Sequence, residues 1–509
     1  MKPWISALAL AACGVPATAS PRFEPARLCS MCHSNIPIDS SNAAPYALWL
    51  GSMKANASRD PYWLAKVREE VALNPLAAAV IENKCLSCHA PAQQYAYRGN
   101  MEPLALSKLN VSGEEGVTCT VCHQIGAAGL GTKKSFTAGF LISDTEQIFG
   151  PHANPFAMPM LHHTGYEPTQ AKHILDAALC GTCHTVITPV LNENGKSVGE
   201  FVEQAPYLEW LVSSYPAEGR TCQSCHMPQS GTPAYIAHRP PGGPFPPTSP
   251  RLPFGRHSFS GANVRGAEML AEVLPQNVDA FAQASARASA MLSTAVDLKL
   301  SVSRKGSALE LTVDVKNLAG HKLPTAYPSR RLWLHVKALD ADGQTVFESG
   351  ALDRATGEIR GAGGDQGHLT RISSPGQVMI YEAEHEDGAG KPAVSLVRAA
   401  KYRKDNRLLP RGFDLRKGLP DGLSSQVIAP IGTAGDSDFL PGSDRVLYVL
   451  PNNVTHVTAE ALYQSIKPSH AATTGSVNHP DSQRFGELYR LHRDPVVAAR
   501  SELRTANFQ

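Results

Sequence analysis

The chain has 509 residues, with 47 Lys and Arg against 45 Asp and Glu, so its formal charge is +2. This balance excludes a polybasic nucleic-acid binder and a long acidic disordered tail as the main function. Hydrophobic residues make up 42% and charged residues 18%, which is typical of a globular protein with a sizeable core. The unusual numbers are 11 Cys and 19 His.

The N-terminus has the three parts of an export signal. Lys2 gives a basic start, a short apolar run follows, and Ala17-Thr18-Ala19 fits a cleavage site. No later stretch reaches the roughly 18 apolar residues that a membrane span needs. We therefore expect residues 1–19 to be a signal peptide and the mature chain to be periplasmic or extracellular. The alternative is a lipoprotein acylated at Cys13, which is less favoured because the segment before it is short.

The other ten cysteines all fall into C-x-x-C-H strings, of which there are five. At this composition, chance would give about 0.01 such strings. Two thiols spaced in this way on one helical turn can form thioethers with a haem, and the adjacent His then binds the iron. Disulfide frameworks, thioredoxin-like sites and zinc knuckles do not require a His after each pair. The motifs therefore predict five haem c groups.

The predicted covalent attachment sites are Cys29 and Cys32, Cys85 and Cys88, Cys119 and Cys122, Cys180 and Cys183, and Cys222 and Cys225. The predicted proximal iron ligands are His33, His89, His123, His184 and His226. Because a ferric haem with its propionates adds a charge of about −1, the mature holoprotein is expected to carry about −4.

The pattern divides the chain into an α+β arrangement. The motifs are too closely spaced for an independent core around each haem, which predicts a mainly helical, loop-rich pentahaem domain over 20–294. Within it, Asp60-Pro61 is typical of a helix start, and 261–293 is Ala-rich and helical. Alternating apolar residues then predict an immunoglobulin-like β-sandwich over 295–465. We expect a C-terminal helical tail over 466–509, with a helix from Ser482 to Arg504 that packs back on the haem domain.

Two short patterns occur twice. Pro-Tyr-x-x-Trp-Leu-x-Ser begins at Pro45 and again at Pro206, after the first and the fourth motif. Glu-Gly-x-Thr begins at Glu115 and again at Glu218, directly before the third and the fifth motif. The matching order indicates an old duplication of haem-binding helices. The alternative is that Tyr and Trp simply pack on haem faces twice.

Electron-transfer haems usually need a second axial ligand. Fourteen His remain, and some of them must be ligands, although any one candidate could equally be a surface or hydrogen-bonded residue. The candidates in marked contexts are His152, His162, His163, His173, His257 and His321. A thioether ligand from Met53 is a further possibility. His335 lies on a predicted strand and is expected to be structural, and the weaker candidates are His470, His479 and His492.

Several of these stretches resemble multihaem c-type cytochromes of the tetrahaem-cytochrome and hydroxylamine-oxidoreductase-related superfamily. The stretches are Trp49–Pro61, Glu82–Pro91, Gly116–His123, Pro206–Trp210 and Cys222–Pro228. Within this group the chain is most similar to cytochromes with a C-terminal β-domain, some of which polymerise into extracellular filaments. The resemblance implies that His257 and His321 are distal iron ligands.

The sequence is compatible with three functions. Closely packed haems favour electron transfer between redox partner proteins. The alternative is a reductase acting on a small nitrogen or sulfur oxyanion. The pentahaem nitrite reductases share the haem number, but they typically carry a C-x-x-C-K string, which does not occur here. Finally, the haem-free β-domain could dock a partner, or supply His321 to a neighbouring subunit of an oligomer or filament.

Overall fold

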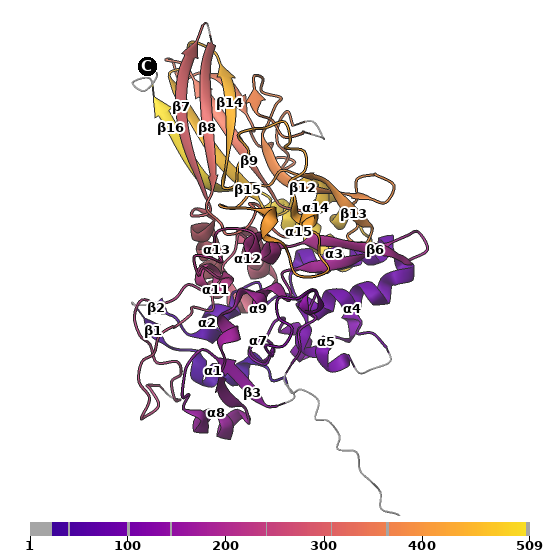
Figure 1. Cartoon of the computed structure of the whole chain (residues 1–509), viewed down its shortest axis with the longest axis vertical. Coiled ribbons are helices and arrows are strands. Elements are labelled where there is room, and N and C mark those ends of the chain that lie inside the picture. Colours follow the sequence, from indigo (N-terminus) through magenta and orange to yellow (C-terminus); the bar gives the residue numbers. More distant parts are fainter. Residues whose placement is uncertain are drawn as a thin grey trace, which may run out of the picture.

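The computed structural model describes residues 23–38, 41–98, 102–142, 145–240, 242–306, 308–362 and 366–504. A helical, loop-rich half precedes a strand-rich half, which is the predicted α+β arrangement (Figure 1). The predicted signal peptide and Cys13 lie outside the described residues. Within the described ranges, every helix is too short or too polar to cross a membrane.

The helices of the first half are short and its strands form small pairs. The helices are α1 (Ala26–His33), α2 (Pro45–Leu50), α3 (Pro61–Leu73), α4 (Ala78–His89), α5 (Pro91–Tyr97), α6 (Val111–Glu114), α7 (Cys119–Cys122), α8 (Ala157–Thr164), α9 (Ala177–Gly181), α10 (Pro206–Leu211), α11 (Cys222–His226), α12 (Val264–Val273) and α13 (Val278–Leu292). The strands are β1 (Pro37–Ile38), β2 (Ser41–Asn42), β3 (Gln147–Gly150), β4 (Glu167–Gln170), β5 (Val186–Leu191) and β6 (Ser197–Gln204). Much of this half packs in separate small apolar clusters, as expected where porphyrins complete the core.

Two stretches with helical sequence are each divided at a proline. The stretch after Asp60 contains α3 and α4, which are separated at Pro75, and 261–293 contains α12 and α13, which are separated at Pro275. A proline has no N–H to donate and its ring clashes with the preceding turn, so a helix rarely continues through it. The predicted helix start is confirmed, because the Asp60 carboxylate accepts a hydrogen bond from the second residue of α3.

The second half contains two sheets that pack face to face. Its strands are β7 (Val296–Lys305), β8 (Ala308–Asn317), β9 (Arg331–Leu339), β10 (Thr345–Ser349), β11 (Arg371–Ile372), β12 (Ile380–Asp387), β13 (Ala399–Asp405), β14 (Ser443–Leu450), β15 (His456–Gln464) and β16 (Val496–Arg504). One sheet has the order β13-β12-β9-β15-β16, with β10 beside β9, and the other has the order β11-β14-β8-β7. Alternate residues of both sheets share one apolar core, so the predicted sandwich is present.

The C-terminal tail differs from the prediction. Its helices are α14 (Pro468–Gly475) and α15 (Pro480–His492), and the helix predicted to run on to Arg504 is wrong beyond His492. Residues 496–504 instead form β16, which pairs antiparallel with β15 and returns the chain to the sandwich. An edge of β15 that would otherwise expose unpaired backbone groups is covered in this way. The helical part packs against α3 and α12 of the first half, as predicted.

Candidate haem sites

Each Cys-x-x-C-H motif lies on or just after a short helix in the lower half of the molecule (Figure 1). Helices α1, α4 and α11 end at the motif histidine, α7 ends one residue before it, and α9 ends three residues before it. A helical turn places residues three apart on the same face, so the two thiols of a motif can face one porphyrin. The ten motif cysteines are partly buried free thiols. Motifs and haems are numbered 1 to 5 in chain order below.

Four of the predicted proximal histidines are oriented by a backbone carbonyl. In each case ring atom Nδ1 lies within hydrogen-bond distance of a carbonyl oxygen from a distant segment, which fixes the proton on Nδ1 and leaves the Nε2 lone pair for a metal. The pairs are His33 with Ile236 at 2.8 Å, His89 with Ala57 at 2.8 Å, His123 with Phe149 at 2.6 Å and His226 with Ser260 at 2.6 Å. The chain therefore fits haem at these motifs.

Two predicted distal histidines lie opposite proximal ones. The rings of His123 and His257 are 6.2 Å apart at an interplanar angle of 16°, and those of His226 and His321 are 6.2 Å apart at 15°. Two metal–imidazole bonds of about 2 Å each, plus the half-width of each ring, account for this separation. Burial lowers the pKa of both His257 and His321 to about 4, so both rings are neutral, as metal ligation requires.

His257 belongs to a loop that serves two motifs. Its own Nδ1 lies 2.9 Å from the Gly255 carbonyl, and its ring packs edge-on against Phe259. Three residues after His257, the Ser260 carbonyl accepts the hydrogen bond from His226. The loop thus places a ring over motif 3 and orients the proximal histidine of motif 5.

His321 lies in the loop between β8 and β9 and is held by a buried ion network. The neighbouring Lys322 is fully buried, and its Nζ lies 2.6 Å from Asp405. Asp405 also accepts from Arg407 at 2.7 Å, and Arg407 reaches Glu209 of α10 at 2.9 Å. Glu209 closes the network by accepting from the Lys322 backbone N–H at 3.1 Å. The loop is thereby fixed to the haem-binding half of the same chain, which does not fit the hypothesis that its histidine serves a neighbouring subunit.

Motif 4 has a different neighbour. Nζ of Lys54 lies 2.6 Å from Nε2 of His184. The Lys54 charge, together with burial, holds the pKa of His184 far below its usual value. The adjacent Met53, considered as a thioether ligand, packs instead against Gly266 of α12: a Cβ added at that glycine would lie 3.3 Å from the Met53 methyl carbon.

The remaining distal candidates are not paired with a proximal ring. His162 and His163 lie exposed on α8, and His163 Nε2 is 2.9 Å from the sulfur of Met31 inside motif 1. His173 turns its Nε2 to the Ile125 carbonyl at 2.8 Å. His152 is half-buried, and burial lowers its pKa. For these four residues, iron ligation stays a sequence prediction.

Three of the other histidines singled out from the sequence have polar partners, whereas the ring of His470 packs edge-on against Tyr327 and its Nδ1 has no hydrogen-bond partner among the described residues. His335 on β9 lies between Glu348 and Glu460, at 3.1 and 3.2 Å, which agrees with its predicted structural role. His479 accepts a hydrogen bond from a backbone N–H at the start of α15. His492 lies 3.3 Å from Glu268 of α12.

The cysteines show which motifs are adjacent. The thiols of Cys29 and Cys119 share a hydrogen bond, which joins motifs 1 and 3. The thiol of Cys183 is hydrogen-bonded to the second thiol of motif 2, and the thiol of Cys180 to the first thiol of motif 5. Burial is the main cause that raises the pKa of Cys122 of motif 3, and both motif 4 thiols lie near enough to add to it. Motif 4 is therefore the junction among the motifs.

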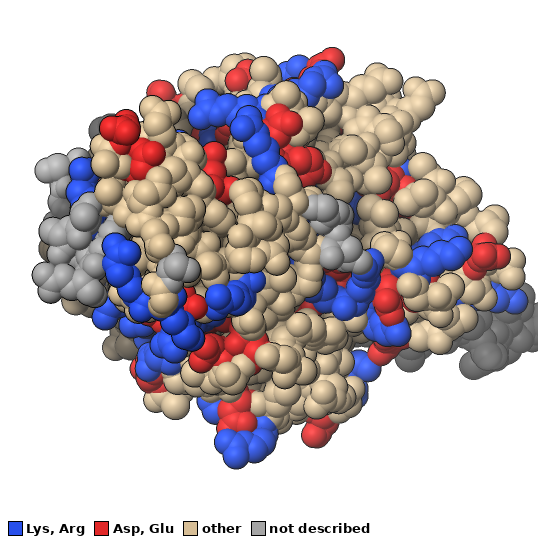
Figure 2. Space-filling view, turned by 90° about the horizontal axis from the view of Figure 1, so that it is seen from above, with Lys and Arg blue, Asp and Glu red and all other residues tan. Residues whose placement is uncertain are grey.

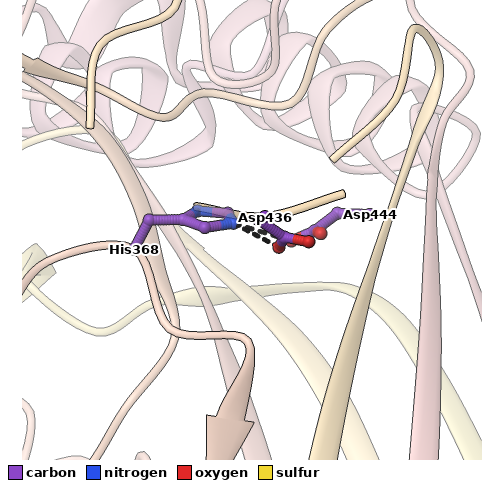
Figure 3. Close-up of side chains that lie close together, drawn as sticks. All are labelled: His368, Asp436 and Asp444. Carbon is purple, nitrogen blue, oxygen red and sulfur yellow. Dashed lines mark hydrogen bonds and ion pairs between the residues drawn. The ribbon is translucent and has the colours of Figure 1, made fainter. Parts of the chain in front are cut away.

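A separate group of titratable side chains lies inside the sandwich (Figure 3). One potential ligand atom from each of His368, Asp436 and Asp444 lies within 4.8 Å of the other two. His368 Nε2 is 2.8 Å from Asp436, and Asp444 accepts a hydrogen bond of 2.6 Å from the Tyr381 hydroxyl. These residue types could bind a metal ion, but the hydrogen bonds of the group leave no lone pair of His368 directed at such a site.

The proton position on His368 follows from Asn406. The Asn406 side-chain oxygen accepts from the Glu382 backbone N–H, and its amide nitrogen donates to the Ile380 carbonyl. The amide nitrogen therefore donates its other hydrogen to His368 Nδ1, at 3.3 Å. His368 then carries its proton on Nε2, directed at Asp436, where a metal ligand would need a lone pair. The group is a hydrogen-bonded network within the sandwich.

Comparisons with known proteins agree with these sites. Residues 28–124, which contain motifs 1 to 3, match the family described as cytochrome c554 and c-prime. The fold is similar to the crystal structure of a penta-heme cytochrome c552 from Thermochromatium tepidum, with a TM-score of 0.53 and 18% identity over 94% of this chain and 98% of that one. No curated protein matches the chain in a sequence search. These findings support a multihaem c-type cytochrome.

Sequence reasoning missed the residues that orient the histidines. The carbonyl groups of Ile236, Ala57, Phe149 and Ser260 carry no side-chain signal, because any residue provides a backbone oxygen. Lys54 was also missed. Its only signal was its position beside Met53 in a stretch that resembles multihaem cytochromes.

Proposed function

We propose that the chain is an electron-transfer protein that carries five covalently bound haems c and passes electrons between redox partner proteins. The motif cysteines hold the haems, the motif histidines are the proximal ligands, and His257 and His321 are distal ligands of haems 3 and 5. Each haem, when bound, supplies an iron that takes up and gives back one electron. At haems 3 and 5, the paired histidine rings would hold the iron from both faces.

The adjacency of the motifs is the observation that supports this function. Hydrogen-bonded thiols join motif 1 to 3, 4 to 2 and 4 to 5, and the charges of motif 4 reach Cys122 of motif 3. Haems attached at these sulfurs would lie in contact along a branched path. A path with several ends suits a protein that receives electrons at one surface and delivers them at another.

The proposal includes a place outside the cytoplasm. It rests on the predicted export signal over residues 1–19, because haem c is attached in the compartment to which such a signal directs the chain. At the sandwich end of the molecule, Lys, Arg, Asp and Glu side chains are interspersed over the surface (Figure 2). Association through this face would depend weakly on salt, because neighbouring charges of opposite sign cancel. An oligomer or filament of the chain would assemble through the same face.

The test is a haem count combined with electron transfer. Mass spectrometry of the secreted protein should give a chain that begins near residue 20 and carries five haems. Stopped-flow mixing with a reduced small cytochrome should then oxidise the donor by five equivalents. Fewer than five haems, or steady turnover of nitrite or sulfite by the reduced protein, would contradict the proposal and favour the reductase alternative.

A further inference from the structure

We propose that Lys54 provides the sixth ligand of haem 4, so that this iron is bound by the imidazole of His184 and the amine of Lys54. The inference rests on the proposed function, in that Cys180 and Cys183 must hold a haem. Neither the motif nor the comparisons assign a distal ligand to this haem.

The distance between the two side chains carries the first step. Nζ of Lys54 lies 2.6 Å from the ring atom of His184 that faces the iron position. Two metal–nitrogen bonds of about 2 Å each require roughly 4 Å between these atoms. The four-carbon lysine stem is flexible enough to withdraw by this difference along the same line. Lys54 is also half-buried, so its amine is turned inward and not toward solvent.

The backbone around Lys54 repeats the design of the His257 loop. In that loop, His257 faces the proximal histidine of motif 3, and the carbonyl three residues later orients the proximal histidine of motif 5. Around Lys54, the side chain faces the proximal histidine of motif 4, and the Ala57 carbonyl, three residues later, orients that of motif 2. Lys54 thus occupies the position that His257 occupies in the other loop.

The segment that carries Lys54 is held firmly. The Lys54 carbonyl accepts a hydrogen bond of 2.9 Å from the backbone N–H of Val117, which lies two residues before motif 3. The fully buried Asn56 donates to the carbonyls of Leu50 and Ser52 at 3.0 and 2.9 Å. These bonds fix the backbone relative to motif 3, so the lysine side chain has a defined direction toward motif 4.

The chemistry requires a proton to leave. An ammonium group has no lone pair, so Lys54 binds the iron only after it has released one proton, and no electron changes hands in this step. The nitrogen–iron bond then closes the second face of haem 4. Because motif 4 is the junction of the path, a closed face there favours electron transfer over binding of a small substrate.

The test is spectroscopic and uses the full-length haem-loaded protein. Near-infrared magnetic circular dichroism of the oxidised wild type should show one histidine–amine haem among the five. Lys54→Leu should remove that band and convert one haem of five to a high-spin form that binds added cyanide. Methylamine or imidazole added to Lys54→Ala should restore the low-spin form, which a merely structural lysine would not allow.

Lys84→Leu is the matched control, because this lysine is exposed and lies directly before motif 2. It should leave all five haems unchanged. If Lys54→Leu fails to fold, Lys54→His should still give a low-spin haem with the band of a bis-histidine site. The proposal is overturned if the wild type lacks a histidine–amine band, or if haem 4 is already high-spin and Lys54→Leu leaves it so. A count below five haems would instead overturn the proposed function.

Discussion

At the scale of single residues, buried polar groups fix both the sandwich and its junction with the haem half. His385 on β12 is an example, because it is buried and its Nε2 has no hydrogen-bond partner. Its ring packs edge-on against Tyr402 and against Phe201 of β6, at 4.8 and 4.9 Å between centroids. Burial, with the nearby charges of Arg407 and Lys467, lowers its pKa to about 3, which the opposing charge of Asp405 only partly offsets.

This lowered pKa predicts a pH dependence of stability. The unfolded chain binds a proton at His385 below about pH 6.5, whereas the folded chain does so only near pH 3. The free energy of unfolding should therefore fall as the pH falls below 6.5, by up to about 1.4 kcal/mol per pH unit. His385→Phe should keep the aromatic packing and remove this loss, so that the variant exceeds the wild type by about 2 kcal/mol at pH 5. Urea unfolding at pH 5 and pH 8 measures the difference in free energy of unfolding between the two proteins. Parallel pH curves for the two proteins would refute the prediction.

At the scale of elements, the two halves of the sequence repeat have the same local structure. Trp49 of α2 donates its indole N–H to the Val117 carbonyl at 2.9 Å, and Trp210 of α10 donates its indole N–H to the Arg220 carbonyl at 2.8 Å. Each acceptor lies two residues before a haem motif. The repeats also join equivalent motifs, 1 with 3 and 4 with 5, through hydrogen-bonded thiols. Packing on a haem face alone would not reproduce these backbone contacts, so the duplication explains more.

The repeated glycines offer a matched pair of variants. Gly116 and Gly219 both have a left-handed backbone, with φ of +65° and +69°. A Cβ at Gly116 would lie 2.6 Å from the Lys54 carbonyl and 2.9 Å from the Ala57 nitrogen, whereas nothing lies within 4 Å at Gly219. Gly219→Ala should cost only the backbone strain, about 1 kcal/mol. Gly116→Ala should cost more and also displace the segment that carries Lys54.

Both variants can be read by thermal unfolding and by the high-spin fraction of the oxidised protein. Only Gly116→Ala should produce a high-spin signal, and the signal should correspond to haem 4. Equal effects of the two substitutions would show that the close contact with Lys54 and Ala57 does not matter.

The sequence predicted the elements that have a local cause and missed those with a distant one. The five motifs, the Asp60 helix start and the alternating strands from Val296 onward depend on neighbouring residues, and the structure has each of them. Strand β16 was predicted as helix because its pairing with β15 is a contact between distant segments. Lys54 was missed for the same reason, since 130 residues separate it from His184.

At the scale of the whole molecule, one apolar core crosses the boundary between the halves. It joins the two sheets to Ala177 and Ala178 of α9, where motif 4 begins, and to Leu208 of α10 in the second repeat. The buried network from Lys322 to Glu209 lies at the same junction. The sandwich is therefore firmly attached to the haem half at the point where its β8–β9 loop presents His321 to His226.

A pair of histidine substitutions tests this role of the sandwich. His321→Ala removes the ring that lies 6.2 Å from His226, so one haem of five should become high-spin and open to added imidazole. His335→Ala removes a ring on β9 whose two nitrogens contact Glu348 and Glu460, so it should alter stability slightly and leave the haem spectra unchanged. Electron paramagnetic resonance of the oxidised proteins distinguishes the two outcomes. If His321→Ala stays fully low-spin, the sandwich does not supply a ligand, and its attachment to the haem half serves packing alone.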